Sequence, residues 1–193
     1  TALQSGPTAL TSLLTLGALT GLAAPFAPPY VALAGLLALE VGVIRFALGA
    51  FRVGRVAYLM SQPVVAGFTA AAGIVIVCTQ FPPILGLSSD AAHPVVSAIG
   101  TLLDPTVGDV PSGIPTPSIT LPWSMAGRLL LPALTIAVVG FAEPSAIARH
   151  YASADRTAWD PNREFVSQGL ANVVTGLFRA YPVGSSFSRS ALN

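Results

Sequence analysis

Charged residues are scarce in this sequence of 193 residues. Asp, Glu, Lys and Arg make up only 9% of the chain, while 53% is hydrophobic; ordinary soluble domains carry about 25% charged residues. A soluble chain of this length could not cover its surface with so few charges. No charge precedes Glu40, and none lies between Arg55 and Asp90. Such long uncharged runs predict transmembrane helices, which need about 20 residues each.

Other features are also missing. Lysine is absent and the net charge is only +1, so no electrostatic argument favours nucleic acid as a partner. The single cysteine, Cys78, can form no intrachain disulfide, and neither His93 nor His150 has metal-ligand partners at useful spacing. We find no phosphate loop, dinucleotide motif or zinc motif, and no Asp/His pair near Ser188. We therefore expect no enzymatic activity, no cofactor and no metal.

The apolar runs divide the chain into helix candidates separated by polar or proline-rich stretches. Residues 88–122 are rich in Pro, Gly, Ser and Asp and predict an irregular connection. Four long segments, a shorter helix and a polar loop that enters a further helix are predicted. They are residues 6–24, 30–52, 61–87, 123–151, 162–178 and 181–193.

Arginine positions predict the orientation of these segments in a membrane. Arginines follow the second and the fourth long segment, and loops rich in Lys and Arg face the cytoplasm. Residues 88–122, which lack both, are then external. The arginines concerned are Arg52 and Arg55 after the second segment, and Arg149, Arg156 and Arg163 after the fourth.

Two predicted helix starts have the composition of an anion site. Free N–H groups and the positive end of the helix dipole attract anions at a helix N-terminus. Two half-helices that meet in the middle of a membrane with facing N-termini would form such a site. Two ordinary helix caps in loops are the alternative. The residues are Gly6, Pro7, Thr8 and Ala9 at the first start, and Ser185, Ser186, Phe187, Ser188 and Arg189 at the second.

Two acidic residues lie inside apolar segments. A carboxylate within a membrane span is costly, so it is a candidate for function by default. Glu143 lies within the fourth segment and could carry a coupling proton, bind a cation or pair with an arginine. Glu40, in the second segment, is interpreted as a structural acid paired with an arginine.

Several motifs resemble those of the sulfate-permease (SulP) family of anion transporters. The most specific stretch is YP at residues 181–182, followed by SFSRSA at residues 186–191. The other similar stretches are GAFRVG at 49–54, SQPVVAGF at 61–68, IP at 114–115, GFAE at 140–143, IAR at 147–149, NREF at 162–165 and GLAN at 169–172.

The resemblance implies an all-α membrane protein with fourteen spans in two inverted repeats of seven. The half-helices that open at Pro7 and Phe187 would be spans three and ten, which meet at the substrate site. Residues 1–193 would be an incomplete transmembrane domain without the family's STAS domain. Residues 1–87 would hold spans three to five, and residues 123–193 spans eight, nine and the start of ten. Residues 88–122 would connect them externally in place of spans six and seven.

The sequence departs from the family pattern near the expected site. Gly184 and Ser185 stand where the family more often has Thr-Gly, and Pro144 stands where a small polar residue is commoner. Ile147 replaces the hydroxyl that sodium-coupled members tend to carry one turn after the acid. This replacement argues against sodium coupling and favours protons at Glu143.

The resemblance therefore implies secondary active transport of an inorganic anion, either sulfate, bicarbonate or chloride, by proton coupling or exchange. Membrane lipid would surround the protein, and the full-length form would be a homodimer in a bacterial inner (plasma) membrane. An uncoupled anion channel on the same scaffold and a truncated remnant without transport are the alternatives. A nucleobase carrier is a weaker one.

Overall fold

The computed structural model describes residues 5–24, 27–55, 67, 70–71, 116–154, 156–186 and 190. The chain divides into two compact units, Thr1–Val65 with Thr116–Asn193, and Ala66–Pro115. In the second unit only Gly67, Ala70 and Ala71 are described, and they are helical. Most of the predicted segment at residues 61–87 thus lies outside the described residues. The fold presented below is that of the first unit.

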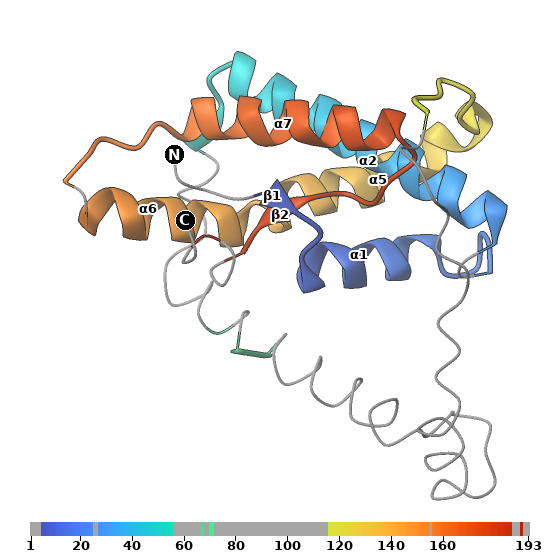
Figure 1. Ribbon diagram of the computed structural model, residues 1–193, viewed down its shortest axis with the longest axis horizontal. Coiled ribbons are helices and arrows are strands. Elements are labelled where there is room, and N and C mark those ends of the chain that lie inside the picture. The colour runs from blue at the N-terminus through green and yellow to red at the C-terminus, as the bar shows by residue number, and fades with distance from the viewer. Residues whose placement is uncertain are drawn as a thin grey trace, which may run out of the picture. The chain divides into compact units, whose positions relative to one another are not determined.

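Helices make up almost all of the regular structure in this unit (Figure 1). Two helical runs, Pro28–Ala50 and Trp123–Ser153, are long and apolar enough to cross a membrane. The elements are β1 (Ser5–Gly6), α1 (Ala9–Leu19), α2 (Pro28–Ala50), a 3-10 turn η2 (Trp123–Met125), α5 (Ala126–Val139), α6 (Ala142–Ala154), α7 (Pro161–Leu177) and β2 (Gly184–Ser185). The predicted helices at residues 30–52 and 162–178 are confirmed, each displaced by only one or two residues.

The first predicted helix is shorter than expected. It begins at Ala9 instead of at the Gly-Pro pair, and it ends at Leu19 instead of near residue 24. Thr8 is the N-cap, so Pro7 precedes the helix. Gly6 is extended because it pairs with Gly184 in a two-stranded sheet. At the other end Gly21, with φ of +88°, turns the chain toward α2.

The fourth predicted segment is not one continuous helix. α5 ends at Val139 and α6 begins at Ala142, with a turn at Gly140 and Phe141. The Ala137 carbonyl, which Phe141 would use in a continuous helix, accepts a hydrogen bond from Arg45 Nε at 3.2 Å. Phe141 N instead donates to the Val138 carbonyl. The local sequence contributes to the break as well, because Pro144 has no N–H to donate to the Gly140 carbonyl and its ring would clash with that carbonyl in a continuous helix.

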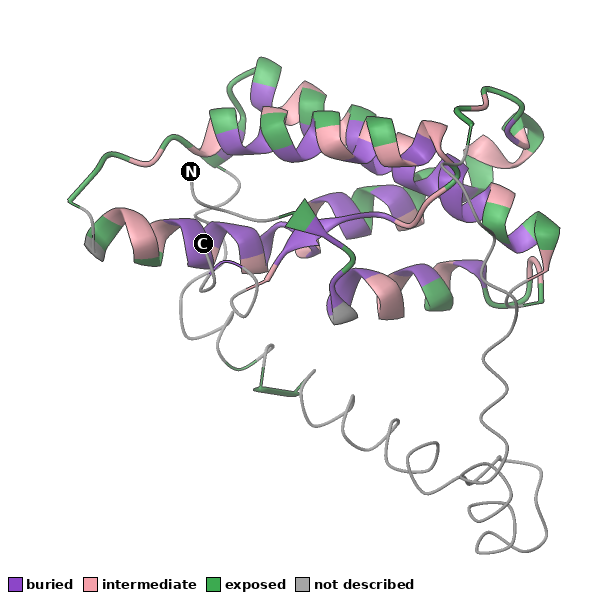
Figure 2. Cartoon of the chain, in the orientation of Figure 1, coloured by how far each residue is buried: buried purple, intermediate pink, exposed green. Residues whose placement is uncertain are grey.

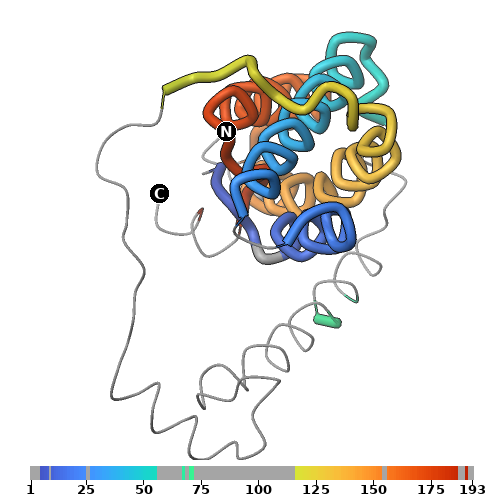
Figure 3. The backbone as a smooth tube through the Cα atoms, turned by 90° about the vertical axis from the view of Figure 1, so that its right-hand side faces the viewer, coloured from blue at the N-terminus to red at the C-terminus, as the bar shows by residue number. Residues whose placement is uncertain are grey.

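Glycines allow α2 and α7 to pack closely as an antiparallel pair. A Cβ atom at Gly42 would lie 2.5 Å from Val173 N, and one at Gly169 would lie 2.5 Å from Phe46 N. Similar contacts repeat along α2 at intervals of seven residues. The close-packed glycines are Gly35, Gly42 and Gly49 on α2, and Gly169 and Gly176 on α7. In the view along the helices, α2 lies between α7 and α5, with α1 beside it (Figure 3).

The core of this unit gathers where α2, α5 and α1 face one another (Figure 2). It is aliphatic apart from Tyr30, whose ring centroid lies 6.1 Å from that of Tyr181. The fully buried members on the two long helices are Ala34, Leu36, Leu37, Val41, Leu129, Ala133, Ile136 and Ala137. Polar side chains that are equally buried are concentrated near β1 and β2.

Three helices end at an arginine with a left-handed backbone. The φ angles are +57° at Arg52, +53° at Arg156 and +53° at Arg179. Each arginine is followed by a residue whose N–H closes the last turn, such as Val53 N to the Leu48 carbonyl at 2.8 Å. Glycine is the usual residue at this position. Arginine complements the negative end of the helix dipole there.

Candidate functional site

Strands β1 and β2 bring the two predicted helix starts together. They pair antiparallel, with Ser5 opposite Ser185 and Gly6 opposite Gly184 (Figure 1). Gly184 also packs on the first turn of α1, because a Cβ there would lie 3.5 Å from Thr8 Cγ2. The two helix starts that the sequence indicates as an anion site lie near opposite ends of the chain. Their described residues are therefore adjacent in space.

The start of α1 is a capping box made of two threonines. Thr11 N donates to Thr8 Oγ1 at 3.2 Å, and Thr8 N donates to Thr11 Oγ1 at 3.1 Å. Both side chains are buried. Among the described residues, the backbone N–H groups of Ala9 and Leu10 have no recorded acceptor. These are the donors that a helix N-terminus can offer to an anion.

The second helix start is described in part. Ser190 is helical, and its N–H donates to the Ser186 carbonyl at 3.0 Å. Ser185 is fully buried, and Ser190 is 2% exposed. Three predicted site residues, Phe187, Ser188 and Arg189, lie outside the described residues.

Side chains from α7 hold the edge of β2 that faces away from β1. Val183 N donates to Asn172 Oδ1 at 2.9 Å, and Asn172 Nδ2 donates to the Val183 carbonyl at 3.0 Å. One amide side chain thus takes the place of a neighbouring strand. Gln168 Nε2 donates to Ser185 Oγ at 2.7 Å and to Glu164 Oε1 at 3.1 Å.

Sequence reasoning gave no site role to Glu164, Gln168 or Asn172. They are spaced at i, i+4 and i+8, so they share one face of α7, and all three are buried. A stripe of amide and carboxyl groups on one face of a helix was the available signal.

Arg45 is also part of this site. Its guanidinium is fully buried and donates to three carbonyls: Ala137 at 3.2 Å, Ile136 at 3.1 Å and Val183 at 3.0 Å. The sequence analysis did not identify it, although an arginine five residues before the end of a 23-residue apolar helix was a signal.

Glu143 lies in the first turn of α6, which packs beside β2. An acidic side chain is favourable there because the helix N-terminus is positive. Its neighbour Phe141 stacks on Phe165 with ring centroids 3.6 Å apart. Because α5 and α6 are separate helices, Glu143 lies at a helix start. The sequence suggested instead that Glu143 lies within one continuous helix.

The predicted pairing of Glu40 with an arginine is wrong for the described residues. Glu40 Oε2 is buried and has no hydrogen-bond partner among them. Arg163 instead forms an ion pair with Asp160, with Nε 3.6 Å from Oδ2.

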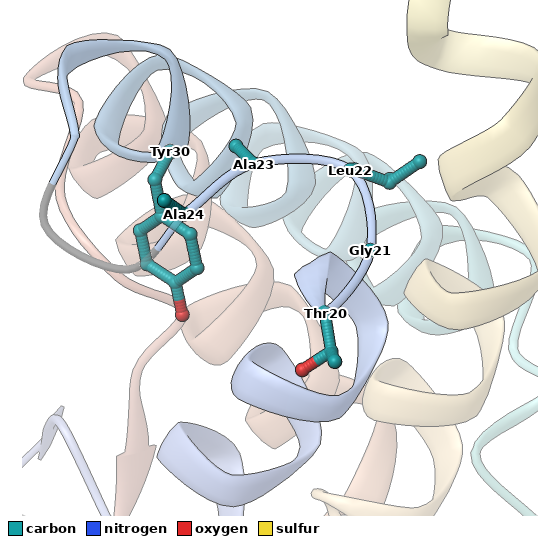
Figure 4. Close-up of a pocket in the computed structure, with 6 residues that line it drawn as sticks. All are labelled: Thr20, Gly21, Leu22, Ala23, Ala24 and Tyr30. Carbon is teal, nitrogen blue, oxygen red and sulfur yellow. The ribbon is translucent and has the colours of Figure 1, made fainter.

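Two cavities lie away from this site. One of about 390 Å³ is at the C-terminal end of α1, lined by Thr20, Gly21, Leu22, Ala23, Ala24 and Tyr30 (Figure 4). Another of about 360 Å³ lies between Leu13, Leu14, Gly17 and Ala18 of α1 and Leu131, Pro132, Thr135 and Ile136 of α5. Both are mainly apolar, and neither is lined by Thr8, Gly184 or Ser185.

Comparison with known proteins identifies the family. The model of the Sulfate permease family matches residues 1–106 and 95–193, which together cover the chain. This chain belongs to the sulfate permease family. It is 31% identical over 251 residues to the probable sulfate transporter 4.2 of Arabidopsis thaliana. That match covers 99% of this chain and 37% of the plant protein, so the chain spans little more than a third of that relative's length.

Solved structures confirm the fold of a sulfate permease membrane domain. The transmembrane domain of a cyanobacterial bicarbonate transporter, BicA, aligns with a TM-score of 0.79 and 21% identity, over 99% of this chain and 63% of that one. The structure of SLC26A9 aligns with a TM-score of 0.75 and 17% identity, over 98% and 42%. The chain therefore has a helical transmembrane fold.

Proposed function

We propose that this chain forms the anion-binding core of a secondary active transporter of inorganic anions. The observation that carries the proposal is the pairing of β1 with β2, which places the start of α1 beside Gly184 and Ser185. The anion would lie against Gly6, Thr8 and Ala9 and against residues 185–188, with the backbone N–H of Ala9 as a donor, since the Thr8 N–H already donates to Thr11 Oγ1. Pro7 would set the entry to α1, and the Arg189 side chain would add a full positive charge.

The names of two relatives support the substrate class. The plant relative is called a probable sulfate transporter, and BicA is called a bicarbonate transporter. These names support sulfate and bicarbonate, and we keep chloride as the third anion because of the family resemblance. Glu143 would couple transport to protons, because Ile147 offers no hydroxyl to a sodium ion one turn after the acid.

The proposed domain organisation follows the same relatives. Residues 1–87 would form spans three to five and residues 123–193 spans eight, nine and the start of ten, with residues 88–122 in place of spans six and seven. Two observations support a missing internal segment. The family match is in two pieces that overlap at residues 95–106. The alignment with the plant protein spans 251 residues, more than this chain contains.

The elements of the proposed site lie in one compact unit. α1, α6, α7 and β2 all belong to the first unit, so the anion site and Glu143 would move together. Alternating access would then arise from motion of this unit against the rest of a homodimeric protein in a bacterial inner membrane.

Uptake into proteoliposomes tests the proposal. Radiolabelled sulfate and bicarbonate are offered to vesicles containing the full-length protein, with and without an inward proton gradient. We expect uptake that the gradient stimulates and that Arg189→Ala abolishes. Absence of uptake of either anion into tight vesicles would overturn the assignment and favour a protein without transport activity.

The role of Glu143 is tested by Glu143→Gln, with Glu40→Gln as the matched control for an acid in a predicted span. In a coupled transporter, Glu143→Gln removes the stimulation by protons, whereas Glu40→Gln keeps it. Conductance that persists in Glu143→Gln would instead identify an uncoupled channel.

A further inference from the structure

Arg45 has an unusual place for a charged side chain. It is fully buried, and it lies inside a helix long and apolar enough to span a membrane. Charged groups in such positions are costly and are usually paired. Here the guanidinium donates to carbonyls at the end of α5 and to the Val183 carbonyl just before β2.

The charge of Arg45 is offset only in part. No carboxylate forms an ion pair with it among the described residues. The Ile136 and Ala137 carbonyls belong to the last turn of α5, where the helix dipole is partly negative. Partial charges of this kind stabilise a guanidinium without cancelling its unit charge, so a positive potential remains around it.

The guanidinium lies directly behind the proposed anion site. A Cβ atom on Gly140 would be 3.0 Å from Arg45 Nη2 and 3.5 Å from Thr11 Cγ2, so the guanidinium and the first turn of α1 both lie beside the Cβ side of Gly140. On the other side Arg45 Nη1 is 3.0 Å from the Val183 carbonyl, and Val183 directly precedes Gly184 of β2. Arg45 thus contacts elements next to both helix starts without being one of their donors.

We propose that Arg45 is a specificity-determining residue whose fixed charge makes the site favour divalent over monovalent anions. The proposal rests on the proposed anion site. It deepens that function by assigning sulfate, and not chloride or bicarbonate, as the preferred class of substrate. Arg45 acts through its electric potential and through the position of Val183, and it does not touch the anion.

Anion charge gives the proposal a quantitative signature. The energy of an ion in a potential is proportional to its charge, so removing Arg45 costs a divalent anion twice the binding free energy that it costs a monovalent anion. Because Kd depends exponentially on that free energy, the factor in Kd for the divalent anion is the square of the factor for the monovalent anion. At a separation near 10 Å in a protein interior, one unit charge changes a Kd roughly tenfold per unit of anion charge. Loss of a purely structural contact would instead weaken both anions by the same factor.

The experiment measures Kd for sulfate and perchlorate, which are tetrahedral anions of different charge, by calorimetry on the purified full-length protein. For Arg45→Gln we expect Kd to rise roughly tenfold for perchlorate and roughly a hundredfold for sulfate. Arg45→Lys keeps the charge and should preserve the ratio of the two values. Because both anions are measured on one preparation, partial loss of folded protein does not alter the ratio. Arg45→Met replaces Arg45→Gln should the latter not fold.

The outcomes separate this inference from the proposed function. Equal weakening of both anions in the neutral variants, or no weakening of either, would overturn the role of Arg45 and leave the transporter assignment intact. Failure of the wild-type protein to bind either anion would overturn the anion site itself, and the inference with it.

Discussion

At the residue scale, the site depends on side chains that act as backbone partners. Asn172 satisfies both the N–H and the carbonyl of Val183. Asn172→Leu leaves these buried groups unpaired, and we expect it to destabilise the protein by about 2–4 kcal/mol, since each unsatisfied buried group costs about 1–3 kcal/mol. Thermal unfolding of the purified protein in detergent measures this. Ser167→Ala, at an exposed position on the same helix, is the control. Equal stability of the Leu variant and the wild type would contradict the account.

The candidate site was predictable from the sequence only where single residues carry the signal. Glycine, proline and hydroxyl groups around Thr8 and Ser186 indicate helix starts, and Glu143 is conspicuous in an apolar run. Arg45 was not identified as a site residue because its carbonyl partners lie more than 90 residues away in the chain. Its role depends on the tertiary fold, which the local pattern does not encode.

At the element scale, the α2–α7 pair is held at a close distance by its glycines. Gly42→Val places a side chain where a Cβ would be 2.5 Å from Val173 N. We expect a loss of about 1–3 kcal/mol or more, because overpacking separates the helices. Thermal unfolding again provides the measurement. At Gly17, where nothing lies within 4 Å of a Cβ, Gly17→Ala should be neutral or stabilising by up to about 1 kcal/mol. A tolerated Gly42→Val would contradict this packing.

Acid should remove the stability that the Asp160 carboxylate gives to the start of α7. Hydrogen bonding from the Asn162 N–H holds the pKa of the Asp160 carboxyl below its usual value. A carboxyl with a lowered pKa stabilises the fold above the pKa of the unfolded chain, and that contribution is lost as pH falls through the lowered value. Asp160→Asn keeps an N-cap, so we expect equal stability at neutral pH and a weaker dependence on acid. Unfolding temperatures measured across the acid range test this, and parallel curves for the two proteins would refute it.

The elements were predictable to different degrees. α2 follows from a long apolar run and α7 from a shorter helix candidate, and both lie within two residues of their predicted bounds. The break between α5 and α6 had a local signal in Pro144, which cannot donate to the Gly140 carbonyl, whereas the hydrogen bond from Arg45 to the Ala137 carbonyl comes from another helix. β1 and β2 have only two residues each, and their pairing joins opposite ends of the chain. No local propensity acts over that distance.

At the scale of the whole molecule, the orientation of the helices across the membrane stays a prediction. The ends that carry Arg52, Arg156 and Arg163 lie on one side of the unit, at the left in Figure 1. This agrees with the predicted cytoplasmic side. In a Cys78→Ser background, Arg163→Cys should react with a membrane-impermeant maleimide only in inside-out vesicles. Thr116→Cys, from the predicted external connection, should react only in intact cells. Labelling with the opposite pattern would reverse the topology.

The central claim is that the paired helix starts bind the anion. The most direct measurement locates selenate, a heavy analogue of sulfate, by anomalous diffraction from crystals of the full-length protein. The account predicts a peak between the first turn of α1, at Thr8 and Ala9, and residues 185–188. A fully occupied peak elsewhere, for example beside the exposed Arg179, with none at the paired strands, would contradict it.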